Sequence, residues 1–174
     1  ERKCKYYNLK VLPIHEKKLL LGKIANISFG LLLSNLVIFA GASIGGEILG
    51  TTISVSGGAA GVVLLSVCYL WEIPLYLFLS VRSGMFASVF CCIVLSASGV
   101  AAVADGSFWW TLPSSVPVRL MCPVLGLLPN GLPVPDGSVL QETGVIVPGV
   151  IISLFWFAGM TLLFVRWFVR REAE

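Results

Sequence analysis

The sequence predicts an all-α membrane protein with four transmembrane helices and a long proline-rich outer loop between the third and the fourth. Three observations support this fold class. The chain of 174 residues is 57% hydrophobic and only 12% charged, with a mean hydropathy of +0.93, whereas a soluble domain carries about 25% charged residues. It contains four apolar runs of about 20 residues or more, each long enough to cross about 30 Å of hydrocarbon. Its basic residues lie outside those runs, except Arg166 in the last turn of the fourth, and they are found chiefly near the two ends.

We expect the four spans at residues 24–48, 55–81, 84–104 and 145–168. Helices are favoured over barrel strands because every backbone N–H and C=O in the hydrocarbon must be paired, and because these runs are uniformly apolar where a barrel strand would alternate. We treat residues 1–174 as a single four-helix transmembrane domain.

The basic residues predict the orientation of the spans. Seven of the twelve lysines and arginines lie within residues 1–23, Arg82 lies between the second and third spans, and three arginines end the fourth. Four crossings place all three sets on one side of the membrane, which the positive-inside rule makes the cytosolic side. We therefore expect a basic cytosolic segment at 1–23, two cytosolic termini and an extracytosolic loop at 105–143. We expect the plasma membrane, not an internal membrane.

The outer loop at 105–143 contains six prolines, which prevent a long regular helix. The sequence PNG at 129–131 is typical of a tight turn between two apolar arms, so we expect an ordered hairpin-like cap. Its apolar residues either contact a partner protein or dock onto the chain's own helices, and both alternatives are open. The candidate partner-binding residues of the loop are Trp109, Trp110, Arg119 and Cys122. The two tryptophans also suit an anchor at the membrane interface.

Small residues at four-residue spacing allow membrane helices to approach closely. Gly41 and Gly45 lie near the outer end of the first predicted span, and Gly57 and Gly61 lie near the outer end of the second. We predict that these four glycines pack the first two helices tightly at their outer ends.

A carboxylate lies inside the second predicted span. Glu72 precedes Arg82 by ten residues, so at 1.5 Å per residue it lies roughly 15 Å from the cytosolic edge, near the bilayer middle. An acid at that depth costs about 2.5–3.5 kcal/mol, so we expect it to be protonated, hydrogen-bonded inward, or both. Asn35 reaches nearly the same depth on the first span, and Tyr69 and Tyr76 share a helix face with Glu72. These four residues form the predicted intramembrane polar site.

Two interpretations of that polar site are open. In the first, its residues form interhelical hydrogen bonds that fix packing, or Glu72 pairs with a basic group of a partner subunit. In the second, Glu72 binds a proton or cation on a translocation path. Pro74 lacks a backbone N–H, so we also predict a free Leu70 carbonyl and a bend in the helix at this point.

No catalytic constellation is visible in the sequence. There is no GxSxG, no HExxH and no glycine-rich phosphate loop before a helix, and His15 is the only histidine. The spacing of the cysteines matches no metal-ligand motif. We therefore predict no enzyme activity, no catalytic residues, no metal and no cofactor.

The order of segments resembles that of the tetraspan families, among them the tetraspanins and the CD20-like MS4A proteins, which share cytosolic termini and a large second outer loop. LLGKIANISFGLL at 20–32 is similar to the Leu-Gly opening of the first MS4A helix. The loop lacks the Cys-Cys-Gly signature of tetraspanins, and no functional residue is carried over. The resemblance implies an organising or accessory role.

We predict a non-catalytic accessory or scaffold subunit of a larger membrane complex. It would bind other integral membrane proteins through residues 105–143 and through its glycine-bearing helix faces. The alternative is a channel or transporter subunit that uses Glu72 as an intramembrane proton or cation site. The clustered positive charge marks orientation in the lipid bilayer, so we expect no nucleic acid as a partner.

Overall fold

The computed structural model describes residues 16–50, 54–104, 109–135 and 137–172, and these are mainly helical. Six α-helices and two short 3-10 turns follow one another: α2 (Glu16–Leu49), α3 (Val55–Cys68), α4 (Glu72–Arg82), α5 (Met85–Ala104), α6 (Ser115–Leu125), η2 (Val139–Gln141), η3 (Thr143–Val145) and α7 (Ile146–Glu172). The predicted all-α fold class is confirmed for the described residues. Most of the predicted basic segment at 1–23 lies outside them.

Two of these helices are long and apolar enough to cross a membrane. They are residues Lys17–Ile48 of α2 and residues Thr143–Arg170, which include η3 and most of α7. The pair α3 and α4 counts as a third crossing if the 42° bend between them is a break within one span. Helix α5 matches the predicted third span, but its apolar part, Met85–Ala101, is shorter than these two helices. The described residues thus contain two spans, or three with the bent pair, where the sequence predicts four.

The predicted second span is broken into two helices. α3 ends at Cys68 and α4 begins at Glu72, and the change of direction between them confirms the bend predicted from Pro74. Proline has no N–H to donate to the carbonyl four residues earlier, that of Leu70. This carbonyl is nevertheless not free, because the N–H of Ile73 donates to it at 3.2 Å. The broken turn is therefore closed by tighter i→i+3 hydrogen bonds.

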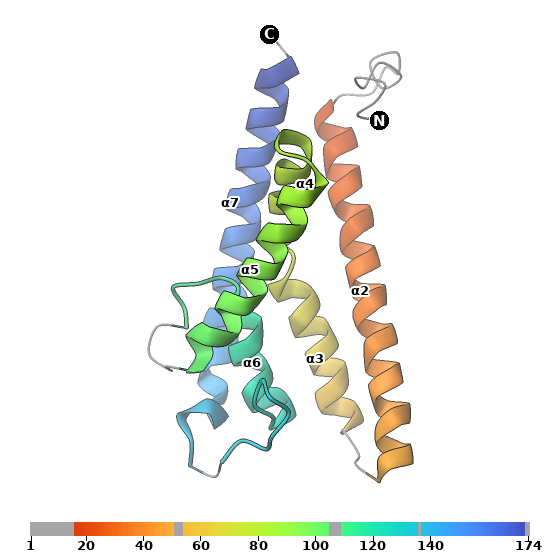
Figure 1. Ribbon diagram of the computed structural model, residues 1–174, viewed down its shortest axis with the longest axis vertical. Helices are drawn as coiled ribbons and strands as arrows, with labels where there is room; N and C mark the ends of the chain where they lie inside the picture. Colours follow the sequence, from red (N-terminus) through yellow and green to blue (C-terminus); the bar gives the residue numbers. More distant parts are fainter. Residues whose placement is uncertain (1–15, 51–53, 105–108, 136, 173–174) are drawn as a thin grey trace.

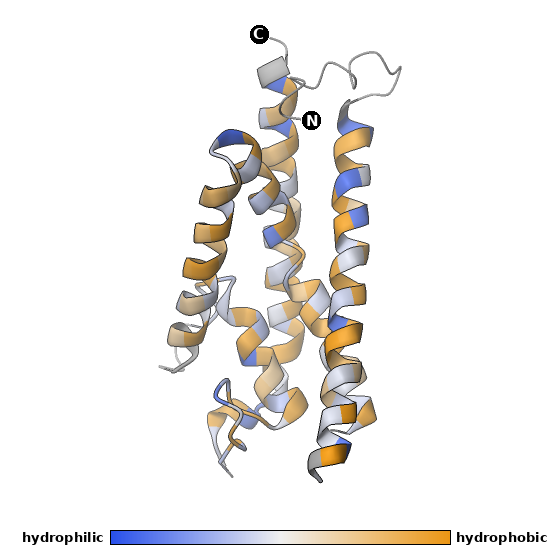
Figure 2. Ribbon diagram, turned by 45° about the vertical axis from the view of Figure 1, so that its right-hand side comes forward, coloured by the Kyte–Doolittle hydropathy of each residue, from blue (hydrophilic) through white to orange (hydrophobic). Residues whose placement is uncertain are grey.

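The first and the last described helical residues lie at one end of the molecule (Figure 1). The start of α2, the turn between α4 and α5, and the end of α7 gather there, while α6, the end of α2 and the start of α3 lie at the opposite end. Hydrophobic residues extend along most of the long helices, and hydrophilic residues concentrate near the end that carries the termini (Figure 2). Among the described residues, the lysines of α2, Arg82 and the arginines of α7 therefore belong to elements that meet at a single end.

Helix α6 is an element that the sequence does not predict, and it lies within the bundle where we expected a loop outside it. It packs against α3, α5 and α7. Val116 and Leu120 of α6 are fully buried and form the hydrophobic core with Cys68 of α3. Of the two alternatives for the apolar loop residues, those of α6 dock onto the chain's own helices.

The two prolines of α6 lie near its ends, where a helix tolerates them. Pro117 lies in the first turn, where a backbone N–H has no partner within the helix in any case. Pro123 lies near the other end, two residues before Leu125, the last residue of the helix. Gly126 then adopts the left-handed conformation with φ 69°, and its N–H donates to the carbonyl of Cys122. The helix is therefore short and is closed by a glycine cap.

Glycines on the neighbouring helices make room for α6. A Cβ at Gly99 of α5 would overlap the backbone oxygen of Ser114, which precedes α6. A Cβ at Gly149 of α7 would lie 2.5 Å from a methyl carbon of Leu120. The hydroxyl groups of Ser98 and Ser114 lie 3.4 Å apart and add a polar contact beside Gly99. Two helix backbones thus approach α6 more closely than a side chain would allow.

The predicted packing glycines are Gly41, Gly45, Gly57 and Gly61. The two on α3 face α6, with backbone or side-chain atoms of α6 within 4 Å of each Cβ position. The two on α2 have open space around them. The predicted contact between these pairs is therefore wrong. Helices α2 and α3 do pack together, but they meet where the ring of Phe39 lies against Gly58.

The tight turn predicted at 129–131 is present beyond α6. The N–H of Gly131 donates to the carbonyl of Leu128 at 2.8 Å, and the N–H of Leu128 donates to the carbonyl of Leu132 at 2.8 Å. An isolated antiparallel bridge joins Leu127 to Pro133. Gly131 has a φ of 82°, a conformation that favours glycine.

We predict that Gly99→Ala loosens α6, because the new Cβ forces the backbone at Ser114 to move and such overpacking costs about 1–3 kcal/mol. Cys122 is 1% exposed in α6. With the other cysteines replaced by Ala, its reaction with a maleimide in detergent should become about tenfold faster. Gly41→Ala is the matched control, since a Cβ there meets nothing within 4 Å. Equal rates for the two variants would contradict the prediction.

Candidate functional site

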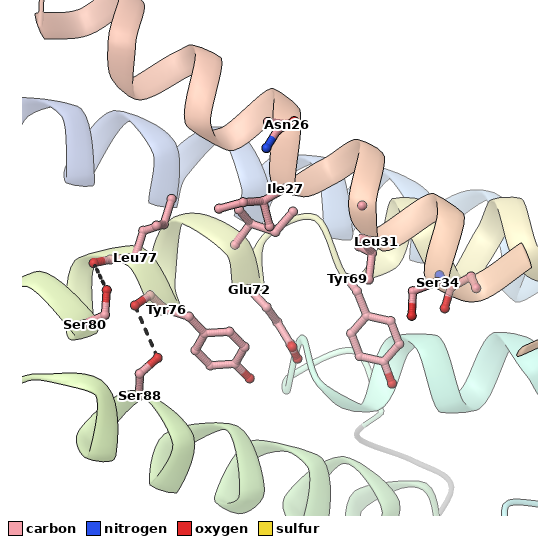
Figure 3. A pocket seen from close by; sticks show the side chains of 13 residues that line it. Asn26, Ile27, Leu31, Ser34, Tyr69, Glu72, Tyr76, Leu77, Ser80 and Ser88 are labelled. Carbon is pink, nitrogen blue, oxygen red and sulfur yellow. Dashed lines mark hydrogen bonds between the residues drawn. The ribbon is translucent and has the colours of Figure 1, made fainter. Parts of the chain in front are cut away.

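The four residues of the predicted polar site line one cleft. A partly open cavity of about 870 Å³ lies between α2 and α4 and reaches the start of α5. Asn35 lines it from α2, Tyr69 from the turn after α3, and Glu72 and Tyr76 from α4 (Figure 3). The sequence prediction that depth and helix face bring these side chains near one another therefore agrees with the structure.

Glu72 owes its position to the break between α3 and α4. It is the first residue of α4, directly after Trp71. The indole of Trp71 is 1% exposed and packs on Trp156 of α7, with ring centroids 6.3 Å apart. Successive helical residues point about 100° apart. With Trp71 buried against α7, Glu72 therefore points away from α7, and it lines the cleft.

Tyr69, Glu72 and Tyr76 lie three and four residues apart, the spacing that places side chains on one helix face. Figure 3 shows all three side chains pointing the same way, with the carboxyl group of Glu72 between the two tyrosine rings. The hydroxyl of Tyr76 lies beside that carboxyl group and the thiol of Cys92. It makes no hydrogen bond of normal geometry with any residue that the structure describes.

Asn35 does not bond to Glu72. Its side-chain amide donates to the hydroxyl of Ser66 on α3 at 3.0 Å, and this hydroxyl donates in turn to the backbone carbonyl of Val62 at 2.7 Å. Asn35 therefore links α2 to α3 at the edge of the cleft. Of the two roles open for the polar site, Asn35 has the packing role.

Four further polar residues line the cleft and were missed by the sequence reasoning: Asn26, Ser34, Ser80 and Ser88. The hydroxyl of Ser88 on α5 donates to the backbone carbonyl of Tyr76 at 3.3 Å, and that of Ser80 donates to the carbonyl of Leu77 at 2.9 Å (Figure 3). Four-residue spacing was the available signal, because Ser80 follows Glu72 by two such steps and Ser34 follows Asn26 by two. The polar lining thus forms a strip along both helices.

The charge of the cleft is unbalanced. Glu72 is the one acidic residue among those lining it, and no lysine, arginine or histidine of the described chain lines it. The remaining lining is made of phenol, hydroxyl and amide groups together with apolar side chains such as Ile27, Leu31 and Leu77. Within the part of the chain that the structure describes, no group of three or more metal-ligating side chains forms. The cleft offers one carboxylate in an otherwise uncharged setting.

The predicted partner-binding residues of the outer segment differ in exposure. Trp110 is 54% exposed, whereas Trp109 is partly buried against the core around Val116. Arg119 is 2% exposed and Cys122 1%. The predicted partner-binding role is wrong for Arg119 and Cys122, because α6 turns both side chains into the bundle.

Arg119 has an internal role. Its guanidinium donates from Nη1 to the carbonyl of Leu140 at 2.9 Å and from Nη2 to the carbonyl of Val139 at 2.6 Å. Both acceptors belong to η2. The arginine therefore fastens α6 to the segment that leads into α7.

Comparison with known protein families, with curated proteins and with solved structures gives no match for this chain.

Proposed function

We propose that the chain is a non-catalytic subunit of a membrane channel or transporter, in which Glu72 receives a proton or a cationic group. The observation that carries this proposal is the cleft of about 870 Å³ with an acid at the start of a broken helix. Broken membrane helices place backbone and side-chain polar groups at depths where an intact helix presents none, and transporters use them as ion and substrate sites.

Packing alone accounts poorly for this acid. A carboxylate that fixes helix packing needs a partner on a neighbouring helix, and the amide that we considered for this purpose, that of Asn35, bonds to Ser66. Acids within the membrane face cavities or pair with cations as a rule. Glu72 faces a cavity, and the described lining contains no cation. A proton or a cation that enters the cavity would supply the positive charge that the lining lacks.

The proposal includes a topology of four crossings: α2, the bent pair α3 and α4, α5, and α7. Both termini and the α4–α5 turn then lie in the cytosol, and the segment that contains α6 lies at the outer face, in the plasma membrane. The support is that the basic residues of α2, Arg82 and the arginines of α7 belong to elements that share one end (Figure 1).

This topology predicts opposite labelling of two exposed residues, Ser83 in the α4–α5 turn and Asn130 in the outer hairpin. Each is replaced by Cys in a chain that lacks other cysteines. In intact cells a membrane-impermeant maleimide should label Asn130→Cys, and Ser83→Cys should react only after permeabilisation. The reverse pattern, or labelling of both in intact cells, would disprove the four-crossing topology.

The role of Glu72 is tested by Glu72→Gln, which keeps the shape of the side chain and removes its charge. In vesicles reconstituted with the purified protein, proton and monovalent-cation flux should fall to the level of protein-free vesicles. Glu47→Gln is the control, because Glu47 is an exposed acid of α2 that does not line the cleft. Unchanged flux in the Glu72 variant rules out transport through this carboxylate.

A second candidate function is an accessory or scaffold subunit that binds other integral membrane proteins, the role that the tetraspan resemblance implies. The observation that favours it is the outer segment, which exposes Trp110, Leu132 and Val139 after α6 has docked. Apolar side chains on an outer segment, clear of the hydrocarbon, are typical of a contact surface.

This second function predicts a neighbour at the outer segment. A photoactivatable amino acid at Leu132, which is 59% exposed, should form an adduct with another membrane protein in native membranes. The same amino acid at Phe155, an exposed apolar residue of the α7 span, should form adducts chiefly with lipid. If both positions gave only lipid adducts or self-adducts, the accessory role through this segment would be excluded.

A further inference from the structure

The cleft has the composition of a site for an organic cation. Tyr69 and Tyr76 place an aromatic ring on either side of the Glu72 carboxyl group (Figure 3). Tyrosine faces attract ammonium groups, and a carboxylate beside them adds a charge-assisted hydrogen bond. The hydroxyl of Tyr76 is buried beside the Glu72 carboxyl group and the thiol of Cys92, so it is the ring of this tyrosine that faces the cleft.

A bare metal ion fits this site poorly. Hard cations such as Ca²⁺ and Mg²⁺ take six or more oxygen ligands at short range, whereas the cleft offers one carboxylate in a space of about 870 Å³. A primary ammonium group has three N–H donors. The two carboxylate oxygens of Glu72 and the phenol oxygen of Tyr69 provide three acceptors.

The walls of the cleft divide by polarity. Ile27 and Leu31 of α2 and Leu77 of α4 provide apolar surface along the same length as the polar strip. The cleft is partly open at the surface of the bundle, so a ligand can enter it from outside. A ligand suited to this geometry has one charged end and an apolar body.

We infer that the cleft binds an amphiphilic amine, with its protonated amino group against Glu72 between the two tyrosine rings and its apolar body along Ile27, Leu31 and Leu77. The inference rests on the proposed function in that Glu72 must receive a cation, and it names the chemical class of that cation.

The test uses the full-length protein in phosphatidylcholine nanodiscs and a photoactivatable twelve-carbon primary amine. The matched twelve-carbon alcohol is the control ligand. The amine should label peptides of α2 and α4 saturably, the alcohol should not, and unlabelled dodecylamine should compete. Glu72→Gln should weaken labelling by about tenfold or more, since it removes the charged acceptor, while Glu47→Gln should leave it unchanged.

A second pair of variants tests the volume of the cleft without touching its charge. Gly30→Phe places a ring in the cleft, because Gly30 lines it and a Cβ there meets nothing within 4 Å. This variant should also abolish labelling. Gly41→Phe is its matched control on the same helix, with equally open space but outside the cleft. The pair decides the question even if the Glu72 variant fails to fold.

Equal labelling by amine and alcohol overturns the inference, and so does amine labelling that survives both Glu72→Gln and Gly30→Phe. A helix of another protein cross-linked at Gly30 in native membranes, excluding the amine, overturns it as well. Cation flux that needs Glu72 but occurs without amine labelling overturns the inference and leaves the proposed function standing. Amine-selective labelling with unchanged flux supports the inference while the transport proposal fails.

Discussion

The close approach of α6 to the backbones of its neighbours is the contact on which the described bundle depends. Gly99 and Gly149 leave the space that α6 occupies between α5 and α7, and this insertion buries Val116 and Leu120 against Cys68 of α3. Arg119 then fastens the inserted helix to η2 through two carbonyl oxygens. With side chains in place of these glycines, α6 could not pack at this position, and its apolar face and the guanidinium of Arg119 would lose their present contacts.

This insertion divides the bundle into two unlike halves. Where α6 fills the space among α3, α5 and α7, the interior is packed with protein. Toward the end that carries the termini, α4 takes a new direction after the 42° bend, and the side of α4 that faces α2 borders a cavity. The cavity therefore lies beside α4, past the bend, and its lining includes no residue of α6. The break between Cys68 and Glu72 makes Glu72 the first residue of α4.

Local rules predicted part of this arrangement. The rise of 1.5 Å per residue and the i, i+4 repeat were sufficient to group Glu72 with Tyr69, Tyr76 and Asn35 and to expect a bend at Pro74, because these relations depend on a single helix and its depth. The contacts of Gly57, Gly61 and Arg119 were mispredicted, because spacing and charge do not specify which helix is the neighbour. Helix α6 was not predicted, because six prolines in the segment argue against a helix. Proline is tolerated in the first turn of a helix, but the sequence does not show where α6 begins.

Arg119 and Glu72 are two charged side chains of the bundle with unlike surroundings. Arg119 is fully buried and holds two backbone carbonyls, so its charge is solvated by the chain itself. Glu72 is only partly buried, beside phenol groups, in a cleft whose described lining carries no positive charge. A buried charge without a partner is costly. The chain satisfies the charge of Arg119 internally, and under the proposed function a proton or a cation that enters the cleft satisfies that of Glu72.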